Sequence, residues 1–375
     1  MTPPAPAADN LTQRFFDLLV GVNPDNKRLG YQIRAGQADS GRTLLEVEAR
    51  AQQLRLAGAQ AKAQFAEFAQ AHLHDEVADE LLRRLHNIDQ VTASLFDPGS
   101  SFYQILDALS AKVVTVNKLD PLISTVPWLV EDLLRLVNQP QYRNRTASGA
   151  MVKDIKTALR YLGVESLQLI LPVYALRRML PHSTDPFTAL KGQLWDYSLA
   201  VAIAAKQLAE HSAEHPYNAF CVGLFHTLGH MVVCRNYLRT YQQVRQQQLL
   251  QARESRNTQL TDVLDGLTPD ASFLAASMAE FAAELSADIT SRWQLHTLPL
   301  CQTLDQLAEG LGFAGSSPLA RLVQQAQTYV QWQELKKRQQ VTEAQAQAWL
   351  AQVQLSQDSI ELLHKTNLKR LGVDI

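Results

Sequence analysis

Apolar residues recur at helical spacing along most of this chain, and no segment shows the strict apolar/polar alternation that is typical of β-strands. One clear series of four apolar residues precedes Gly163: Val152, Ile155, Leu159 and Leu162. Glycine after such a series commonly ends a helix in the left-handed conformation. Ala, Leu and Gln, which favour helices, are abundant. We therefore predict an all-α fold.

The length and charge of the chain narrow its organisation and its partners. With 375 residues, the chain exceeds the size at which single cores usually stop growing, which predicts two or three packed units. Its formal net charge is −2 and its pI is about 6.6. A basic patch for nucleic acid or for an anionic membrane is not indicated. We expect neither as a partner.

Cysteine usage and the N-terminal residues indicate where the protein resides. Three cysteines, Cys221, Cys234 and Cys301, are too few and too odd in number for a disulfide framework. The N-terminus lacks the basic and apolar regions of a signal peptide, and no apolar run approaches the ~18 residues of a membrane span. We expect reduced thiols and a cytoplasmic location.

The first hundred residues contain several helix signals. Residues 1–9 are typical of a flexible tail, and a helix is predicted from Leu11 to Val20, followed by a loop to Ser40. Thr43 and Glu46 match a capping box, which predicts a long helix to about Gln70 and another to about Phe96. The Asp-Pro-Gly-Ser-Ser sequence at 97–101 predicts a turn and a domain boundary.

The remainder is predicted to form a large helical domain and a C-terminal region. A buried helix is expected around Trp195, and its companion is expected over residues 216–237. Ser317 and Pro318 are typical of a helix start, and Thr342–Gln345 matches a second capping box. The predicted divisions are residues 1–97, an N-terminal helical extension, residues 102–315, which we expect to fold alone, and residues 316–375, C-terminal helices packing on that domain.

Several short motifs carry a resemblance to a known family. They are Leu119–Ile123, Leu133–Asn138 with Tyr142, Ala158–Gly163, Leu194–Ser198, Gly223–Gly229, and Trp293–Leu295 with Leu298–Pro299. In this order they resemble the HDOD (HD-related output) domain of bacterial signalling proteins, a non-catalytic relative of HD-type metal-dependent phosphohydrolases. The resemblance covers about residues 100–310 and implies a multi-helix, HD-like bundle.

The departures from the catalytic HD pattern are as informative as the matches. Tyr197 stands where that pattern has a metal-binding histidine, and Thr227 stands where it has the aspartate beside His226. A phenol and a threonine hydroxyl are neutral at pH 7 and offset no charge of a dication. The resemblance therefore implies a vestigial cleft at Tyr197, His226, Thr227 and His230, with no catalytic residue, no metal and no cofactor. We expect the N-terminal helices, which lie outside the resemblance, to cover this cleft or to present a surface to a partner.

A metal site is the alternative interpretation of the histidines at this place. His226, His230 and Cys234 are four residues apart and share one face of an unbroken helix, as metal ligands can. Their neighbours on that face are Val222, Gly229 and Val233, however, which indicates packing. We interpret the two histidines as core residues.

Other charged and histidine clusters have simpler structural interpretations. His211 and His215 lie at a polar helix end, where they interact with the helix dipole. His74 and Asp75 form a literal His-Asp pair outside the family resemblance, on a face predicted to be solvated. The basic run at 336–338 is interpreted as a solvated helix terminus. Common nucleophile and phosphate-loop motifs are absent from the sequence.

These observations favour one functional hypothesis over two others. We interpret the chain as a regulatory module of bacterial signal transduction that acts through contacts with a signalling or regulatory protein, or by sensing a small ligand. The first alternative is a divergent metal-dependent phosphohydrolase acting on a nucleotide or phosphoester with ligands from unexpected positions. The second is a structural protein without signalling input. The sequence gives no oligomeric state.

Overall fold

The computed structural model describes residues 9–22, 46–143 and 151–371, and every regular element within these ranges is a helix. The prediction of an all-α, HD-like bundle is confirmed. Thr43 of the predicted capping box, the side chain of Glu46, the tail at 1–8 and most of the loop before Ser40 lie outside the described residues.

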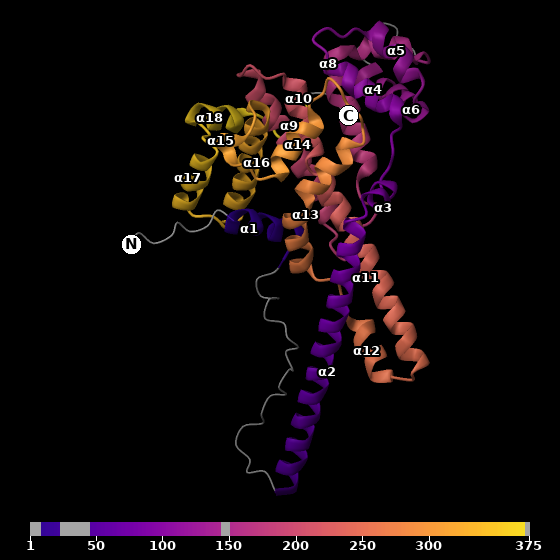
Figure 1. Ribbon diagram of the computed structural model, residues 1–375, viewed down its shortest axis with the longest axis vertical. Coiled ribbons are helices and arrows are strands. Elements are labelled where there is room, and N and C mark those ends of the chain that lie inside the picture. The colour runs from indigo at the N-terminus through magenta and orange to yellow at the C-terminus, as the bar shows by residue number, and fades with distance from the viewer. Residues whose placement is uncertain (1–8, 23–45, 144–150, 372–375) are drawn as a thin grey trace.

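Three helices form the N-terminal part: α1 (Asp9–Val20), α2 (Glu46–Leu85) and α3 (Ile88–Ala93). The prediction of α1 is confirmed. The predicted break near Gln70 is wrong, because α2 continues as one 40-residue helix to Leu85. No glycine or proline lies between Gln70 and Leu85, and Leu73, Val77 and Leu81 bury one continuous face. Helix α2 extends away from the body of the molecule (Figure 1).

A group of helices follows the turn at Asp97: α4 (Ser100–Leu109), α5 (Val116–Ser124), α6 (Pro127–Val137), α7 (Pro140–Arg143) and α8 (Ile155–Met179). The predicted turn is confirmed, with the Asp97 carboxylate accepting from the Gly99 amide at 2.8 Å. Gly163 has a φ of 74° inside α8. The helix therefore breaks at the predicted glycine and resumes immediately after it.

The central helices are α9 (Leu190–Glu210), α10 (Pro216–Phe225), α11 (Leu228–Glu254), α12 (Thr258–Gly266) and α13 (Ala271–Ser291). Helix α10 packs along α9, and α11 packs along α13. The predicted helix over 216–237 is in fact two helices, because a turn at His226 and Thr227 interrupts it and Thr227 leaves the helical φ/ψ region. These two residues form the junction between α10 and α11.

Two glycines of the Gly223–Gly229 motif permit close contact between these helices. A Cβ at Gly223 would lie 2.9 Å from the Ala202 Cα on α9. A Cβ at Gly229 would overlap the backbone carbonyl of Ala282 on α13. Only residues without a side chain fit at these distances. The motif therefore fixes the junction between α9 and α13.

The C-terminal helices are α14 (Leu300–Ala308), α15 (Gly312–Gly315), α16 (Pro318–Lys337), α17 (Glu343–Gln352) and α18 (Gln357–Lys365). The predicted cap of α16 is confirmed, since the Ser317 hydroxyl accepts from the Ala320 amide. The capping box of Thr342 and Gln345 is also confirmed, with both of its hydrogen bonds present. Helix α16 packs against α9.

One hydrophobic cluster joins all of these groups, from Leu11 in α1 to Leu363 in α18. The stretch 216–254 is long and apolar enough, by length and composition, to be a candidate membrane span. Its apolar window is 94% buried inside the molecule. This apolar window therefore lies in the core of the bundle, whereas the C-terminal part of α11 extends from the body beside α2 and α12 (Figure 1).

Candidate functional site

The four residues of the predicted cleft come together at the junction between α10 and α11. Tyr197 lies on α9, His226 and Thr227 form the junction, and His230 lies in the first turn of α11. The ring centre of Tyr197 is 5.2 Å from that of His226 and 6.4 Å from that of His230. The two imidazole centres are 6.2 Å apart. The break at the junction does not separate the two histidines.

The Thr227 hydroxyl is fully occupied by hydrogen bonds. Its Oγ1 lies 2.5 Å from the Ser198 Oγ and 3.2 Å from the Leu224 carbonyl oxygen. The Ser198 Oγ lies 2.7 Å from the Leu194 carbonyl oxygen, so one hydroxyl donates to the other and the second donates to its own backbone carbonyl. Both side chains have no exposed surface. The position that carries an aspartate in the catalytic HD pattern thus holds a neutral hydroxyl pair between α9 and α10.

His226 is held in one orientation by the backbone. Its Nδ1 lies 2.6 Å from the Gly223 carbonyl oxygen, which can only accept, so Nδ1 carries the proton. The His226 carbonyl accepts from the Ser286 hydroxyl at 2.8 Å, and the same hydroxyl accepts from the Gly229 amide. The Nε2 atom is buried without a partner. Burial lowers the pKa of His226 to about 4, so the ring is neutral at pH 7.

His230 is enclosed by aromatic rings. The Phe16 ring of α1 stacks on it, with ring centres 5.0 Å apart. Its Nδ1 is buried without a hydrogen-bond partner. Burial, with a smaller contribution from His226, lowers the pKa of His230 to about 3. This imidazole is therefore also neutral at pH 7.

Helix α1 covers the junction. Phe15 packs on Tyr197 with ring centres 4.7 Å apart, and Phe16 covers His230. The Tyr197 hydroxyl accepts a hydrogen bond from Gln331 Nε2 on α16 at 2.7 Å. Burial raises the pKa of the Tyr197 phenol well above its usual value. The place where a cleft was predicted is thus filled by residues of α1 and α16.

The donors at this junction do not fit a divalent cation. The side chains gathered there are two imidazoles, a phenol and hydroxyls, and a carboxylate is missing from the set. A dication bound in a dry site needs anionic ligands to offset its charge. Across the described ranges 9–22, 46–143 and 151–371, no group of three His, Cys, Asp or Glu residues is placed to hold a metal ion.

The other histidine clusters are structural, and one interpretation needs correction. His211 caps the C-terminus of α9, and its Nδ1 lies 3.1 Å from the Gln207 carbonyl, as predicted. His215 instead caps the N-terminus of α10, where its Nδ1 accepts from the Tyr217 amide, because Pro216 begins the next helix at once. His74 and Asp75 lie on α2, partly and fully exposed respectively.

The cysteines and the basic run are placed as the sequence indicated. The three cysteines are free, with Cys221 and Cys234 buried and Cys301 half-buried. Lys336 and Lys337 lie in the last turn of α16, and Arg338 caps it. Two members of the basic run, Lys337 and Arg338, also line a pocket that the sequence did not predict.

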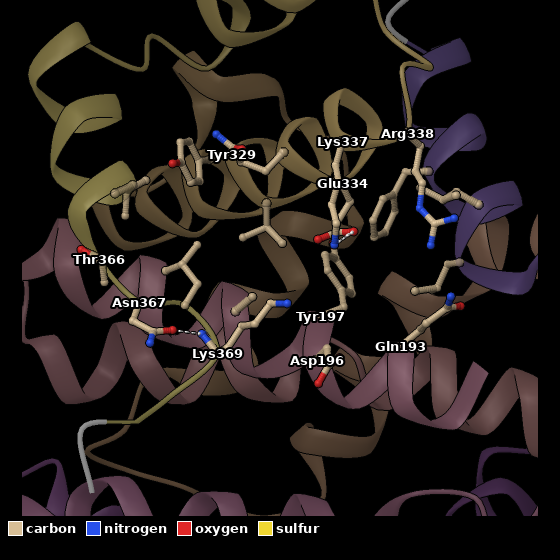
Figure 2. A pocket seen from close by; sticks show the side chains of 18 of the residues that line it. Gln193, Asp196, Tyr197, Tyr329, Glu334, Lys337, Arg338, Thr366, Asn367 and Lys369 are labelled. Atoms are coloured by element: carbon tan, nitrogen blue, oxygen red, sulfur yellow. Dashed lines mark hydrogen bonds and ion pairs between the residues drawn. The ribbon is translucent and has the colours of Figure 1, made fainter. Parts of the chain in front are cut away.

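This pocket has a volume of about 550 Å³ and lies beside the junction, with Tyr197 in its wall (Figure 2). Helix α1 supplies an apolar side through Phe15, Leu18 and Leu19. Helices α9 and α16 and the residues after α18 complete it. Lys337 lies 3.9 Å from Glu334, whereas Arg338 and Lys369 form no ion pair with another described residue. The pocket therefore joins an apolar wall to unpaired cations.

Sequence reasoning missed the residues that close the junction. Phe15 and Phe16 lie some 180 positions or more before their partners, and Gln331 lies 134 positions after Tyr197. Local periodicity marks α1 as amphipathic but does not reveal which surface its apolar face covers. Ser198, the partner of Thr227, did lie inside a motif used for the family resemblance.

Comparisons with known proteins agree with the family resemblance seen in the sequence. A family model described as the HDOD domain matches residues 97–302, more than half of the chain. No curated protein matches this chain.

Three crystal structures resemble the chain. A "Putative phosphohydrolase" from Shewanella amazonensis SB2B is 20% identical, covers 75% of this chain and 94% of that one, and gives a TM-score of 0.47. A "Putative signal transduction protein" from Marinobacter aquaeolei VT8 is 16% identical, covering 78% and 66%, with a TM-score of 0.43. A "Putative metal-dependent phosphohydrolase" from the same Shewanella strain is 12% identical, covering 79% and 100%, with a TM-score of 0.39. At these low TM-scores the family match alone carries the assignment.

Proposed function

The chain belongs to the HDOD domain family, and on that premise we propose that it is a non-catalytic regulatory module of bacterial signal transduction. In this proposal the metal ligands of the HD-type scaffold have been lost. The protein acts in the cytoplasm through contacts with a signalling or regulatory partner, or by sensing a small ligand.

The observation that supports this proposal is the neutral, closed junction of α10 and α11. Thr227 is paired with Ser198, both histidines are buried in the neutral form, and α1 places Phe15 and Phe16 over Tyr197 and His230. A phosphoester carries negative charge and needs cations or a metal at the reacting oxygen. The junction residues supply neither, and Phe15 and Phe16 of α1 cover Tyr197 and His230.

The competing function is a divergent metal-dependent phosphohydrolase. It requires that the purified protein carry a divalent cation in stoichiometric amount and hydrolyse a phosphoester. Purified full-length protein can be assayed with p-nitrophenyl phosphate, bis(p-nitrophenyl) phosphate, nucleotides and a cyclic dinucleotide, with Mg²⁺ or Mn²⁺ present. We expect no turnover above the blank and no stoichiometric metal by elemental analysis. Turnover that chelation and His226→Ala both abolish would refute the regulatory proposal.

The pocket beside Tyr197 favours a ligand-sensing role in particular. Its apolar wall comes from α1, the helix that covers the junction, and its unpaired Arg338 and Lys369 favour a negatively charged group. The pocket lining also contains two carboxylates. Glu334 pairs with Lys337, and Asp196 forms no ion pair with another described residue. An organic anion with an apolar body fits this combination, since pockets bind by apolar area and orient the ligand through a few polar groups.

The ligand class can be tested with simple amphiphiles. Decanoate should bind to the full-length protein in isothermal titration calorimetry, whereas decyltrimethylammonium, with the opposite charge, should not. The double variant Arg338→Gln/Lys369→Gln should weaken decanoate binding about tenfold or more. Lys336→Gln, at an exposed residue of α16 that does not line the pocket, is the matched control. Equal binding of both amphiphiles would mean that Arg338 and Lys369 do not select the ligand by its charge.

A further inference from the structure

The N-terminal half of α2 is largely exposed from Leu54 onward. At about 1.5 Å per residue the 40-residue helix is about 60 Å long. Its C-terminal half buries Leu73, Val77 and Leu81 and packs against α11 and α12. From Leu54 to Gln64, by contrast, no side chain is buried. This half projects into solvent (Figure 1).

A regular apolar series runs along this projecting half. It comprises five residues at alternating spacings of four and three: Leu54, Gly58, Ala61, Phe65 and Phe68. This spacing is the heptad pattern of a two-helix seam. Leu54 is 70% exposed and Phe68 is 71% exposed, and a Cβ at Gly58 would meet nothing within 4 Å. The series is separate from the face that contacts α11, and it lacks a counterpart in the described chain.

From these observations we propose that α2 is a dimerisation helix that pairs, antiparallel, with α2 of a second copy of this chain. The small residues lie in the first part of the series and the large rings in the second part. Antiparallel pairing sets Gly58 opposite the partner's Phe68 and Ala61 opposite the partner's Phe65. Each ring then fills the space beside a small residue, as helix seams require.

A parallel pair fits these residues poorly. It would set Gly58 against the partner's Gly58, which leaves a void, and Phe68 against the partner's Phe68, which crowds two rings in one layer. Voids and overpacking each cost stability. The size pattern alone therefore selects the antiparallel direction.

The charges along α2 select the same direction independently. Residues 50–62 contain three cations and no carboxylate, and residues 67–80 contain five carboxylates and no lysine or arginine. Antiparallel pairing brings the basic stretch of each helix beside the acidic stretch of the other, whereas parallel pairing brings like charges together. Arg55 and Lys62 form no ion pair with another described residue, so both are available to a partner.

The oligomeric state of the full-length protein tests the proposal. Light scattering after size exclusion should give twice the mass of one chain. The double variant Leu54→Glu/Phe68→Glu should give the mass of one chain, with an unchanged circular dichroism spectrum, because both side chains are exposed in the single copy. Leu250→Glu on α11, 53% exposed and off the series, is the matched control and should remain a dimer. A monomeric wild type, or a dimeric double variant, would overturn the proposal.

Engineered cysteines determine the direction of pairing. Two variants are prepared, Gly58→Cys and Phe68→Cys, and each is oxidised alone and after mixing. In the antiparallel arrangement the mixture forms an interchain disulfide between the two introduced cysteines, and neither variant does so alone at that position. Positions 58 of the two copies are then about 15 Å apart, well beyond disulfide reach. Cross-linking of each variant with itself would indicate a parallel pair and refute the proposed direction.

Discussion

Two buried histidines make the stability of this protein sensitive to acid. Burial lowers the pKa of His226 to about 4 and that of His230 to about 3, both below the usual value of 6.5. Below pH 6.5 the unfolded chain takes up protons that the folded chain does not. The free energy of unfolding contributed by these groups is therefore complete above pH 6.5 and is lost as the pH falls towards 4.

The variant His226→Leu isolates this effect. At pH 7 we expect it to fold and to lose about 1 kcal/mol at most, the value of the hydrogen bond to Gly223. Between pH 6 and 4.5 its free energy of unfolding should fall less steeply than that of the wild type, by up to about 1.4 kcal/mol per pH unit. Urea unfolding at several pH values measures both quantities. Parallel curves for the two proteins would mean that His226 is protonated in the folded state.

Glycine at position 229 is required by contact and not by backbone conformation. A Cβ there would overlap the Ala282 carbonyl of α13, so Gly229→Ala must push α11 and α13 apart. We expect a loss of more than 3 kcal/mol, because two backbones cannot adapt as side chains do. Gly192→Ala on α9, where a Cβ meets nothing within 4 Å, is the control and should be neutral or slightly stabilising. Thermal unfolding of both variants decides the matter.

What the sequence could predict at this scale depended on how far apart the interacting residues lie. Residues of α9 and the junction were grouped correctly, because motifs with known order placed Tyr197 near His226 and Thr227. Hydrogen bonds within a few positions, such as the Ser317 and Thr342 caps, were also predictable. The bond from Gln331 to Tyr197 was not, because a glutamine within a helix gives no signal of a partner 134 positions away.

At the scale of single elements, α1 takes the covering position that was one of the two roles expected of the N-terminal helices. Its apolar side supplies Phe15 and Phe16 to the junction and Leu18 and Leu19 to the pocket. Twelve residues of helix are only marginally stable alone, so α1 depends on these contacts. For α2 the predicted break near Gln70 was wrong, because a buried series from Leu73 to Leu85 continues the helix.

Closure of the junction by α1 predicts a change in the chemical accessibility of His230. Phe16→Ala removes the ring stacked on this imidazole and should cost about 3 kcal/mol or more, as is usual for a buried phenylalanine. It should also speed carbethoxylation of His230 by diethyl pyrocarbonate, followed by peptide mass spectrometry. Leu18→Ala, a half-buried residue on the same helix that faces the pocket, is the control and should leave His230 protected. Equal modification of His230 in wild type and Phe16→Ala would refute closure by α1.

At the scale of the whole molecule, the parts that the sequence divided are joined by one core. The family match covers residues 97–302, close to the predicted domain of residues 102–315. Helix α1, however, packs on α9, α13 and α16, and α16 packs on α9. The sequence located the family-specific helices and gave the N-terminal helices as candidates for their cover. It did not indicate the cover by α16 or the individual contacts, because these are set by tertiary packing and leave little trace in local patterns.

Expression of residues 102–315 tests whether this unit is a domain. It retains α4–α14 and most of the central cluster around α10 and α11, so we expect it to fold as a helical domain. It loses Phe15 and Gln331, which leaves Tyr197 exposed on α9, and it loses the contacts of α2 with α11. We therefore expect a lower melting temperature than that of the full chain and stronger binding of a hydrophobic dye.

The outcome distinguishes two views of the molecule. If α1 and α16 serve only to regulate a self-sufficient domain, the fragment will melt cooperatively and keep a dispersed NMR spectrum of methyl groups. If they belong to an indivisible core, the fragment will be insoluble, or compact without fixed packing, with helical circular dichroism but no cooperative transition. That second result would mean that the predicted boundaries of the 102–315 domain are wrong. If the fragment does fold, a peptide of residues 9–22 added to it should restore the protection of His230 and leave α4–α8 unchanged, because the main contacts of α1 within the fragment are with α13 and α9.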